Sequence, residues 1–598
     1  MSGSDSRWAL APHNEWQGRD PFGEIKPADV SAGTFDIGGR DGVRLAAARN
    51  GYASFRLDVT GRGEFRLSAE MARGIEPDLY RAWYHKMASE AAAKASADYC
   101  ADALVPVRDG QTHRLPDDDN AVPGQTHQAF WVDLFVPPDA APGTATGRIV
   151  LEAGGRRVQL PVTVEVLQPV IPDTDAIVAD HNSYGCRWIE GMYSSALAGL
   201  TDPAARWAKV IEILHHYYRL CHEHRGMLSN LGAGHAGTVD PIYAPTLSGR
   251  GRDLTIADWG LFDRHHGPLL DGTAFGTAAP GAPRPRRPAT PVWGVYTPIS
   301  NDWPADYLWW GQPGYDVEFT RGVGQFDRHF RDRGWTTTRP YFFFNHKKRY
   351  RWYEWDGDEP KYGKDDEYFR QMHRLFAAAV GDSPVPWAYR MDASWRMADH
   401  FERFAGMVDF WVCGGFARWY PAEIARTVAR GDTVWTYSGT PGIAEASSAG
   451  LENVLKPWAR GASGHCEWLT TDPGPDPWDA CAGAETGAIY PGERFGIAGP
   501  IPSIRLKLQR NAVQDVNLID AAARSAGRLA ETRAALAERV GVSPWDDPPP
   551  VVRDRPPEEW DSRNLDQSFN ANMTEHAALD PLWWATIRRA ALAAEGKP

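Results

Sequence analysis

The chain has 598 residues, more than one ordinary domain holds, so two or three domains are expected. Its formal charge of −13 and pI near 5.8 argue against a nucleic-acid partner, because phosphates favour basic surfaces. They also give no support for a polybasic membrane-binding surface. Six scattered cysteines, none in Cys-x-x-Cys spacing, predict reduced, buried thiols and no structural zinc site.

The first twenty residues, MSGSDSRWALAPHNEWQGRD, lack the apolar core of a secretion signal. No run of 18 apolar residues occurs, so no transmembrane helix is expected. These two features predict a cytoplasmic protein.

Residues 1–172 are predicted to form an antiparallel β-sandwich. Short runs of alternating apolar and polar residues are separated by Gly, Pro and Asp turns, which is typical of such folds. A proline-bounded segment ends this region near Pro172. The clearest runs cover 52–61, 64–71, 128–137, 147–155 and 156–167.

Residues 173–543 are predicted to form a (β/α)8 barrel with terminal helices. Eight short strands alternate with amphipathic helices or long loops, as at 205–224 and 366–380. One or two helices follow over 503–540. The strands are expected at 176–182, 226–232, 292–298, 339–347, 385–392, 408–415, 432–439 and 463–471.

Residues 544–598 read as a Pro-rich linker followed by a tail. A short helix within 579–595 is expected to dock on the body of the protein.

Two adjacent carboxylates, Asp358 and Glu359, lie in an aromatic loop between the strand at 339–347 and the following helix. Active sites of (β/α)8 barrels are built in such loops, at the carboxyl ends of the strands. Aromatic rings pack on the apolar faces of a sugar, and paired carboxyl groups break its glycosidic bond. The loop therefore predicts a carbohydrate site with catalytic acids.

Several longer segments resemble glycoside hydrolase family 123 and its relatives. They are FWVDLFVPPDAAPGTATG from Phe130, DWGLFDRHHGPLLDGTAF at 258–275, and the DEP tripeptide at 358–360. Near the end, NVLKPWARGASGHCEWLTTDPGPDPWD and YPGERFGIAGPIPSIRLKLQRNAVQDVNLI complete the resemblance, which covers roughly residues 125–525.

The resemblance implies an N-terminal sandwich, a catalytic barrel and a retaining β-N-acetylgalactosaminidase. In that family the acetamido oxygen of the sugar attacks the anomeric carbon. Carried over, Asp358 would stabilise the acetamide and Glu359 would be the general acid and base. Because the strand ends at Asn345–Lys347 and DEP follows about a dozen residues later, we expect the pair to fold back over the strand end.

Polar or aromatic residues at strand ends and in loops are candidate substrate-binding groups, because concave sugar sites need directional donors and flat rings. No cofactor is predicted, since the paired histidines do not share a helix face. The candidates are His181, Asn182, Tyr184, His235, Asp302, Trp303, Asn345, His346, Lys347, Trp355, Arg390, Asp392, Tyr437, Glu467 and Trp468.

Tryptophan is over-represented, with 26 residues, and some of those at strand ends and in loops are expected to line the sugar cleft.

Two alternatives stay open. The chain could be a glycosidase for a sugar without an acetamido group, using Asp392 or Glu467 as nucleophile, with Asp180 as a further strand-end acid. It could also be a barrel that binds glycans without catalysis. A carbohydrate is the expected partner, and neither the sugar nor assembly into a homo-oligomer follows from the sequence.

Overall fold

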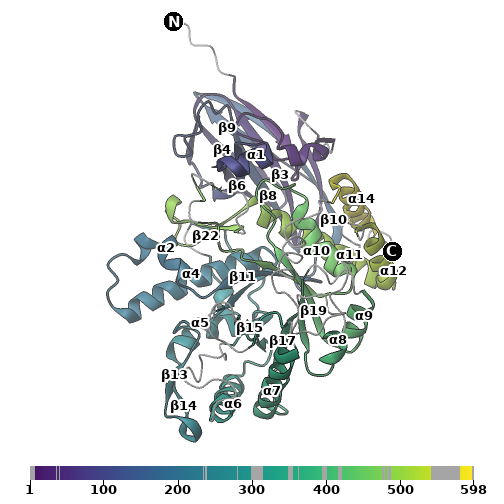
Figure 1. The fold of residues 1–598 in the computed structure, drawn as a ribbon. Coiled ribbons are helices and arrows are strands. Elements are labelled where there is room, and N and C mark those ends of the chain that lie inside the picture. The colour runs from purple at the N-terminus through teal and green to yellow at the C-terminus, as the bar shows by residue number, and fades with distance from the viewer. Residues whose placement is uncertain are drawn as a thin grey trace.

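The computed structural model describes residues 7–34, 37–38, 41–232, 235, 239–278, 281–297, 314–347, 355–360, 363–393, 400–414, 421–474, 477–478, 481, 487–540 and 579–594. Figure 1 shows a β-sandwich at one end of the molecule and a helix-surrounded barrel at the other.

The N-terminal body contains two five-stranded sheets, in the orders β1-β3-β8-β5-β6 and β2-β10-β9-β4-β7. The strands pair antiparallel, except that the edge strand β2 runs parallel to β10. The predicted sandwich is thus confirmed. The strands are β1 (Ala9–His13), β2 (Val43–Arg49), β3 (Gly51–Thr60), β4 (Gly63–Met71), β5 (Glu76–Lys86), β6 (Tyr99–Pro106), β7 (Thr112–Leu115), β8 (His127–Val136), β9 (Gly143–Ala153) and β10 (Arg156–Val170).

Alternation along β10 explains the core of the sandwich. Leu160, Val162, Val164 and Val166 point inward and are buried, while the residues between them face outward. The last sandwich strand ends at Val170, and the first strand of the next body begins at Val178.

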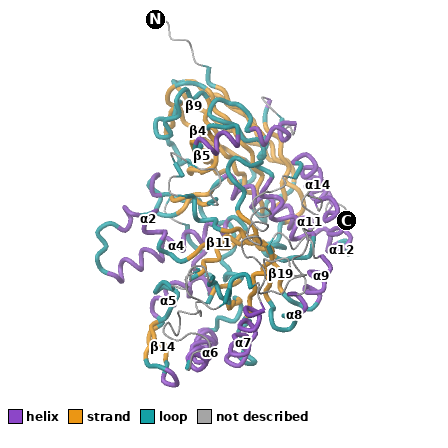
Figure 2. Tube along the Cα trace, viewed as in Figure 1, coloured by secondary structure: helices purple, strands orange, loops and turns teal. Residues whose placement is uncertain are grey.

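The second body is an eight-stranded parallel sheet in the order β12-β11-β20-β19-β18-β17-β16-β15. Its end strands β12 and β15 lie beside each other, so the sheet curls into a nearly closed barrel. The predicted (β/α)8 barrel is confirmed, and Figure 2 shows its strands surrounded by helices. The strands are β11 (Val178–Tyr184), β12 (Gly226–Leu231), β15 (Gly294–Tyr296), β16 (Arg339–Phe342), β17 (Ala388–Ala393), β18 (Phe410–Cys413), β19 (Thr433–Gly439) and β20 (Gly464–Trp468).

Local signals set the helix starts. Asp202 caps α4 by accepting from the amides of Ala204 and Ala205, and Pro203 occupies the first turn. The helices are α1 (Ser89–Ala95), α2 (Trp188–Met192), α3 (Ser194–Leu197), α4 (Pro203–Glu223), α5 (Gly260–Leu270), α6 (Tyr315–Arg333), α7 (Gly363–Val380), α8 (His400–Arg403), α9 (Pro421–Ala429), α10 (Ala449–Ala459), α11 (Ile504–Ser525), α12 (Leu529–Val540) and α14 (Pro581–Ala594).

Helix α11 lies at the junction of the two bodies. Its Lys507 and Arg510 both bind Asp133 of β8, at 2.7 Å each, and all three side chains are buried. Short hairpin strands β13 (Thr246–Ser248), β14 (Thr255–Asp258), β21 (Ile489–Pro491) and β22 (Pro500–Pro502) complete the described elements.

Helix α14 docks on α11, where Trp584 and Arg588 bind Asp515. The predicted Pro-rich linker falls within 541–578, outside the described residues.

Candidate active site

The barrel interior is lined by one face of every strand. Tyr341 and Phe343 of β16 and its extension, together with Trp435 and Cys466, belong to this inner cluster. Because side chains alternate along a strand, the inward positions at the carboxyl ends are fixed by this pattern. They include Asn182, Tyr184, Asn345, Lys347, Arg390, Asp392, Tyr437 and Trp468.

The loop with the adjacent carboxylates folds back over the end of β16. The amides of Gly357 and Asp358 both donate to the His346 carbonyl at 3.1 Å. Glu359 has φ of 58°, in the left-handed region that non-glycine residues adopt uncommonly and that recurs at functional sites. The backbone of β16 thus anchors the carboxylate pair at the barrel mouth.

Lys347 bridges the two carboxylates. Its Nζ lies 2.6 Å from Glu359 Oε2 and 3.2 Å from Asp358 Oδ2. On the far sides, Tyr437 donates to Glu359 Oε1 at 2.6 Å, and His235 Nε2 lies 3.1 Å from Asp358 Oδ2. Five polar side chains from four segments therefore form one network.

The pKa values of Asp358 and Lys347 are shifted in opposite directions by each other's charge. Burial would raise the pKa of Asp358, but the Lys347 ammonium and His235 outweigh it and hold that pKa well below its usual range. Burial would lower the pKa of Lys347, and the two carboxylates instead hold it above its usual range. Asp358 is therefore an ionised carboxylate at neutral pH.

A third carboxylate, Asp392, lies close to the pair on the inner face of the barrel. Burial raises its pKa to about 6, and Asp358 and Glu359 add to the rise, against the opposing effect of Arg390. Arg390 binds both oxygens of Asp392, at 2.7 and 2.9 Å, and its guanidinium lies over the Phe343 ring. Asp392 is thus close enough to sense the charges of the pair, but both of its oxygens are engaged.

Aromatic side chains form part of the rim. The indole of Trp468 is 37% exposed and donates to the Tyr184 hydroxyl at 3.2 Å. The Tyr184 and His235 rings lie 5.2 Å apart. An exposed indole beside three carboxylates offers a flat surface to a bound sugar.

Three predicted binding residues face away from the barrel interior, because each is adjacent along its strand to a residue that faces inward. The His181 ring lies against Gly226, and burial lowers its pKa to about 4. The His346 ring packs 4.7 Å from Trp355 in the outer core. Glu467 accepts from Asn453 of α10 and Gln509 of α11, at 3.0 and 2.8 Å, outside the barrel. Their assignment to the sugar site is corrected.

Several of the tryptophans predicted to line the sugar cleft are buried. Trp355, Trp411 and Trp435 are buried in cores, so none offers a face to a ligand, and Trp355 as a sugar platform is wrong. Among the described residues, Trp468 is the one exposed tryptophan at a strand end or in a loop of the barrel. Asp302 and Trp303 lie outside the described residues.

Asp180, a strand-end acid outside the predicted binding set, belongs to the barrel interior. Burial raises its pKa to about 7, against the opposing charge of Arg390. Its position two residues before Asn182 gives the same inward face, which is the sequence signal that would have included it.

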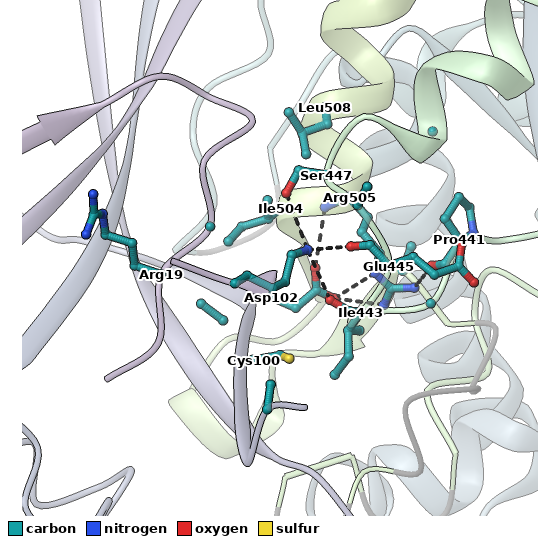
Figure 3. A pocket seen from close by; sticks show the side chains of 18 of the residues that line it. Arg19, Cys100, Asp102, Pro441, Ile443, Glu445, Ser447, Ile504, Arg505 and Leu508 are labelled. Atoms are coloured by element: carbon teal, nitrogen blue, oxygen red, sulfur yellow. Dashed lines mark hydrogen bonds and ion pairs between the residues drawn. The ribbon is translucent and has the colours of Figure 1, made fainter. Parts of the chain in front are cut away.

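A cavity of about 270 Å³ lies elsewhere, between the sandwich and the barrel (Figure 3). Glu467 lines it, but Asp358 and Glu359 do not. Its polar walls are closed by protein contacts: Arg505 binds Asp102 at 2.7 Å, and Lys26 donates to the Glu445 carbonyl at 2.5 Å. This cavity belongs to the junction of the two bodies, so the barrel mouth is the candidate site.

Within the described part of the chain, no group of three or more His, Cys, Asp or Glu side chains is placed to hold a metal ion. None of the described helices is both long and apolar enough to cross a membrane.

No protein-family model matches the chain, and no curated protein matches its sequence. Among solved structures, a family 123 glycoside hydrolase from Clostridium perfringens, studied for glycolipid glycan hydrolysis, is similar. It is 12% identical, with a TM-score of 0.58, and the alignment covers 89% of this chain and 91% of that one. The likeness extends over both bodies, so the two chains share a fold, as the sequence resemblance predicted.

Two further structures are similar at a level too low to support an argument. A putative α-galactosidase from Bacteroides fragilis is 9% identical, covers 79% of this chain and 77% of that one, and has a TM-score of 0.24. A β-glucuronidase from Bacteroides uniformis is 8% identical, covers 74% and 47%, and has a TM-score of 0.26.

Proposed function

We propose that this protein is a glycoside hydrolase whose catalytic pair is Asp358 and Glu359. The observation that carries the proposal is the bridging of both carboxylates by Lys347 at the carboxyl ends of the barrel strands, at 2.6 and 3.2 Å. That edge is where catalytic groups of (β/α)8 barrels gather. The fold shared with a family 123 glycoside hydrolase supports the same class of reaction.

The favoured substrate is a β-linked 2-acetamido sugar, cleaved with retention. The acetamido oxygen would attack the anomeric carbon as the bond to the leaving oxygen breaks, and Glu359 would give its proton to that oxygen. The ring thus formed carries positive charge at the acetamide, where the ionised Asp358 would accept its N–H. Water would then open the ring, with Glu359 taking back a proton.

The contacts that Glu359 makes with Tyr437 and Lys347 restrict its protonation of the leaving oxygen. Tyr437 and Lys347 together contact both oxygens of Glu359. To protonate a leaving oxygen, Glu359 must exchange at least one of these contacts for the substrate. The mechanism therefore assigns Lys347 and Tyr437 as positioning residues that hold the pair until a sugar enters.

A second candidate is direct attack by a protein carboxylate on a sugar without an acetamido group. The observation in its favour is Asp392, a third carboxylate whose pKa of about 6 reflects burial and its proximity to Asp358 and Glu359. Its two contacts to Arg390 count against it, because a nucleophile needs an available oxygen lone pair. Glu467 is not a candidate, since it faces α10 and α11.

The test is release of 4-nitrophenol from aryl β-glycosides of GalNAc, GlcNAc, galactose and glucose. Wild type, Asp358→Asn and Asp392→Asn would be measured together. Turnover of an acetamido sugar that collapses in Asp358→Asn supports the assisted mechanism. Turnover restricted to galactose or glucose, with collapse in Asp392→Asn, supports the second candidate. Absence of turnover, with glycan binding by calorimetry, would contradict both.

A further inference from the structure

A second cavity, of about 70 Å³, lies between α4, α11, the sandwich and the loop near Phe275. One water needs about 10–15 Å³ of such space, so the cavity exceeds the needs of a single water several-fold. Tyr52 and Tyr80 of the sandwich and several prolines form its apolar wall.

The lining is also cationic, and some of its cations lie over the tyrosine rings, Arg510 over Tyr52 at 3.7 Å and Lys507 over Tyr80 at 3.9 Å. Of the described residues, five cationic side chains line this cavity against a single carboxylate, Glu223. The five are Arg219, Arg284, Arg286, Lys507 and Arg510.

The carboxylates near this lining offset only part of its charge, although Arg284, like Arg286, is paired with Glu76. Asp133 is shared by two buried cations, Lys507 and Arg510, at 2.7 Å each. Burial lowers the pKa of Lys507 to about 8, which is the behaviour of an incompletely compensated cation. Arg286 is paired with Glu76 and Asp78.

Arg219 adds a further charge from α4. Its Nε donates to the Ala274 carbonyl and its Nη1 to His216 Nδ1, the latter at 2.8 Å. In the described part of the chain it makes no salt bridge with a carboxylate. Arg219 is half-buried and the Glu212 carboxylate acts on its charge, but among the described residues no carboxylate binds it, so its guanidinium is available to an anion.

Two histidines among the lining residues each have a buried ring nitrogen without a hydrogen-bond partner in the part of the chain that the structure describes. His216 Nε2 and His224 Nε2 are buried and have no hydrogen-bond partner among the described residues. The Glu212 carboxylate is 3.9 Å from His216 Nε2, beyond hydrogen-bond distance. Because His216 Nδ1 accepts from Arg219, its Nε2 carries the proton and is a donor without an acceptor at hydrogen-bond distance among the described residues.

We propose that this cavity, here called the α4 pocket, binds a small organic oxyanion. Its carboxylate or phosphate group would meet Arg219 and His216, and its ring or apolar body would lie against Tyr52 and Tyr80. Guanidinium groups bind both kinds of oxyanion through paired N–H donors. The site is separate from the carboxylate pair and does not depend on the proposed hydrolysis.

Calorimetric titration with phenyl phosphate and with benzoate tests the α4 pocket, with benzyl alcohol as the neutral probe. Arg219→Gln removes the cation. Ala282→Leu fills the pocket without touching a polar group. Arg206→Gln is the matched control, because Arg206 also lies on α4 but pairs with Glu190 at the surface. Glu359→Gln controls for binding at the barrel mouth.

The proposal predicts saturable binding of at least one anionic probe to wild type, Arg206→Gln and Glu359→Gln. Affinity should fall at least about tenfold in Arg219→Gln, the loss expected for one charge-assisted contact. Ala282→Leu should also lose binding, and benzyl alcohol should not bind. No saturable binding of either anion to wild type, or an affinity in Arg219→Gln and Ala282→Leu equal to that of wild type, would overturn it.

Discussion

Tyr437 on β19 donates its hydroxyl hydrogen to Glu359 Oε1 at 2.6 Å, although the two residues are 78 positions apart in the chain. The contact ties the loop after β16 to a strand three places along the barrel. Glu359 is therefore oriented from both sides, by Tyr437 and by Lys347. Its position is a property of the closed barrel and not of the loop alone.

Removing the Tyr437 hydroxyl should lower kcat/KM with little change in folding. Tyr437→Phe deletes a hydrogen bond to a carboxyl group, worth about 1.5–3 kcal/mol when the partner is charged, so kcat/KM should fall roughly 10- to 100-fold. Tyr193→Phe is the matched control, since it deletes a buried hydroxyl contact to Tyr217 at 3.1 Å, away from the barrel mouth. Equal losses in both variants would mean that Tyr437 acts only through stability.

Replacing Lys347 should move the acid limb of the pH–activity profile. In wild type the depressed pKa of Asp358 keeps this carboxylate ionised, and its contribution is lost only as pH falls through that low value. In Lys347→Met burial is no longer opposed by the ammonium, so the pKa of Asp358 rises. The limb should shift to higher pH in kcat/KM, and an unshifted limb would contradict the assigned role of Lys347.

The exposed Trp468 and the buried Trp355 should behave oppositely when each is replaced by alanine. Trp468→Ala should raise KM, because an exposed ring is lost, while stability changes by no more than about 0.5 kcal/mol. Trp355→Ala should instead cost about 3–5 kcal/mol, because it empties a fully buried position. Urea unfolding with steady-state kinetics separates the effects, and a large stability loss in Trp468→Ala would refute its place on the rim.

The junction should be acid-sensitive through Asp133. Lys507 and Arg510 hold the pKa of this buried carboxyl well below its usual range, against the effect of burial. Its stabilisation is present above the unfolded pKa and is lost as pH falls through the folded one. Asp133→Asn should cost about 3–5 kcal/mol near neutral pH, with a smaller difference from wild type in acid. Chemical denaturation at several pH values measures this, and a pH-independent difference would disagree.

Much of the architecture follows from local patterns in the chain. Alternation with period two predicted β3, β4, β8, β9 and β10 of the sandwich, and short buried strands between amphipathic helices predicted the barrel. The pattern did not indicate β5 or β6. Most side chains of β5 are buried on both faces, so its alternation is weak, as for a strand covered on two sides.

The candidate site was predicted less well, for a reason of geometry. Consecutive polar residues at a strand end are all predicted from the sequence to bind the sugar, although neighbouring side chains face opposite sides of the strand. Asn182 and Lys347 therefore point into the barrel interior, whereas His181 and His346 point out of it. The Lys347 bridge depends on where the loop folds back, which is a tertiary contact that no local pattern encodes.

The most direct test of the account is the dependence of Glu359→Gln on the leaving group. Wild type and mutant would be compared on a methyl and a 2,4-dinitrophenyl glycoside of the sugar that wild type cleaves. A general acid contributes about 10²–10⁴-fold where the leaving oxygen needs a proton, and far less where it does not. If Glu359 is the general acid, kcat/KM of Glu359→Gln should fall by that factor on the methyl glycoside and only slightly on the dinitrophenyl one. Equal losses on both substrates, or none on either, would contradict it.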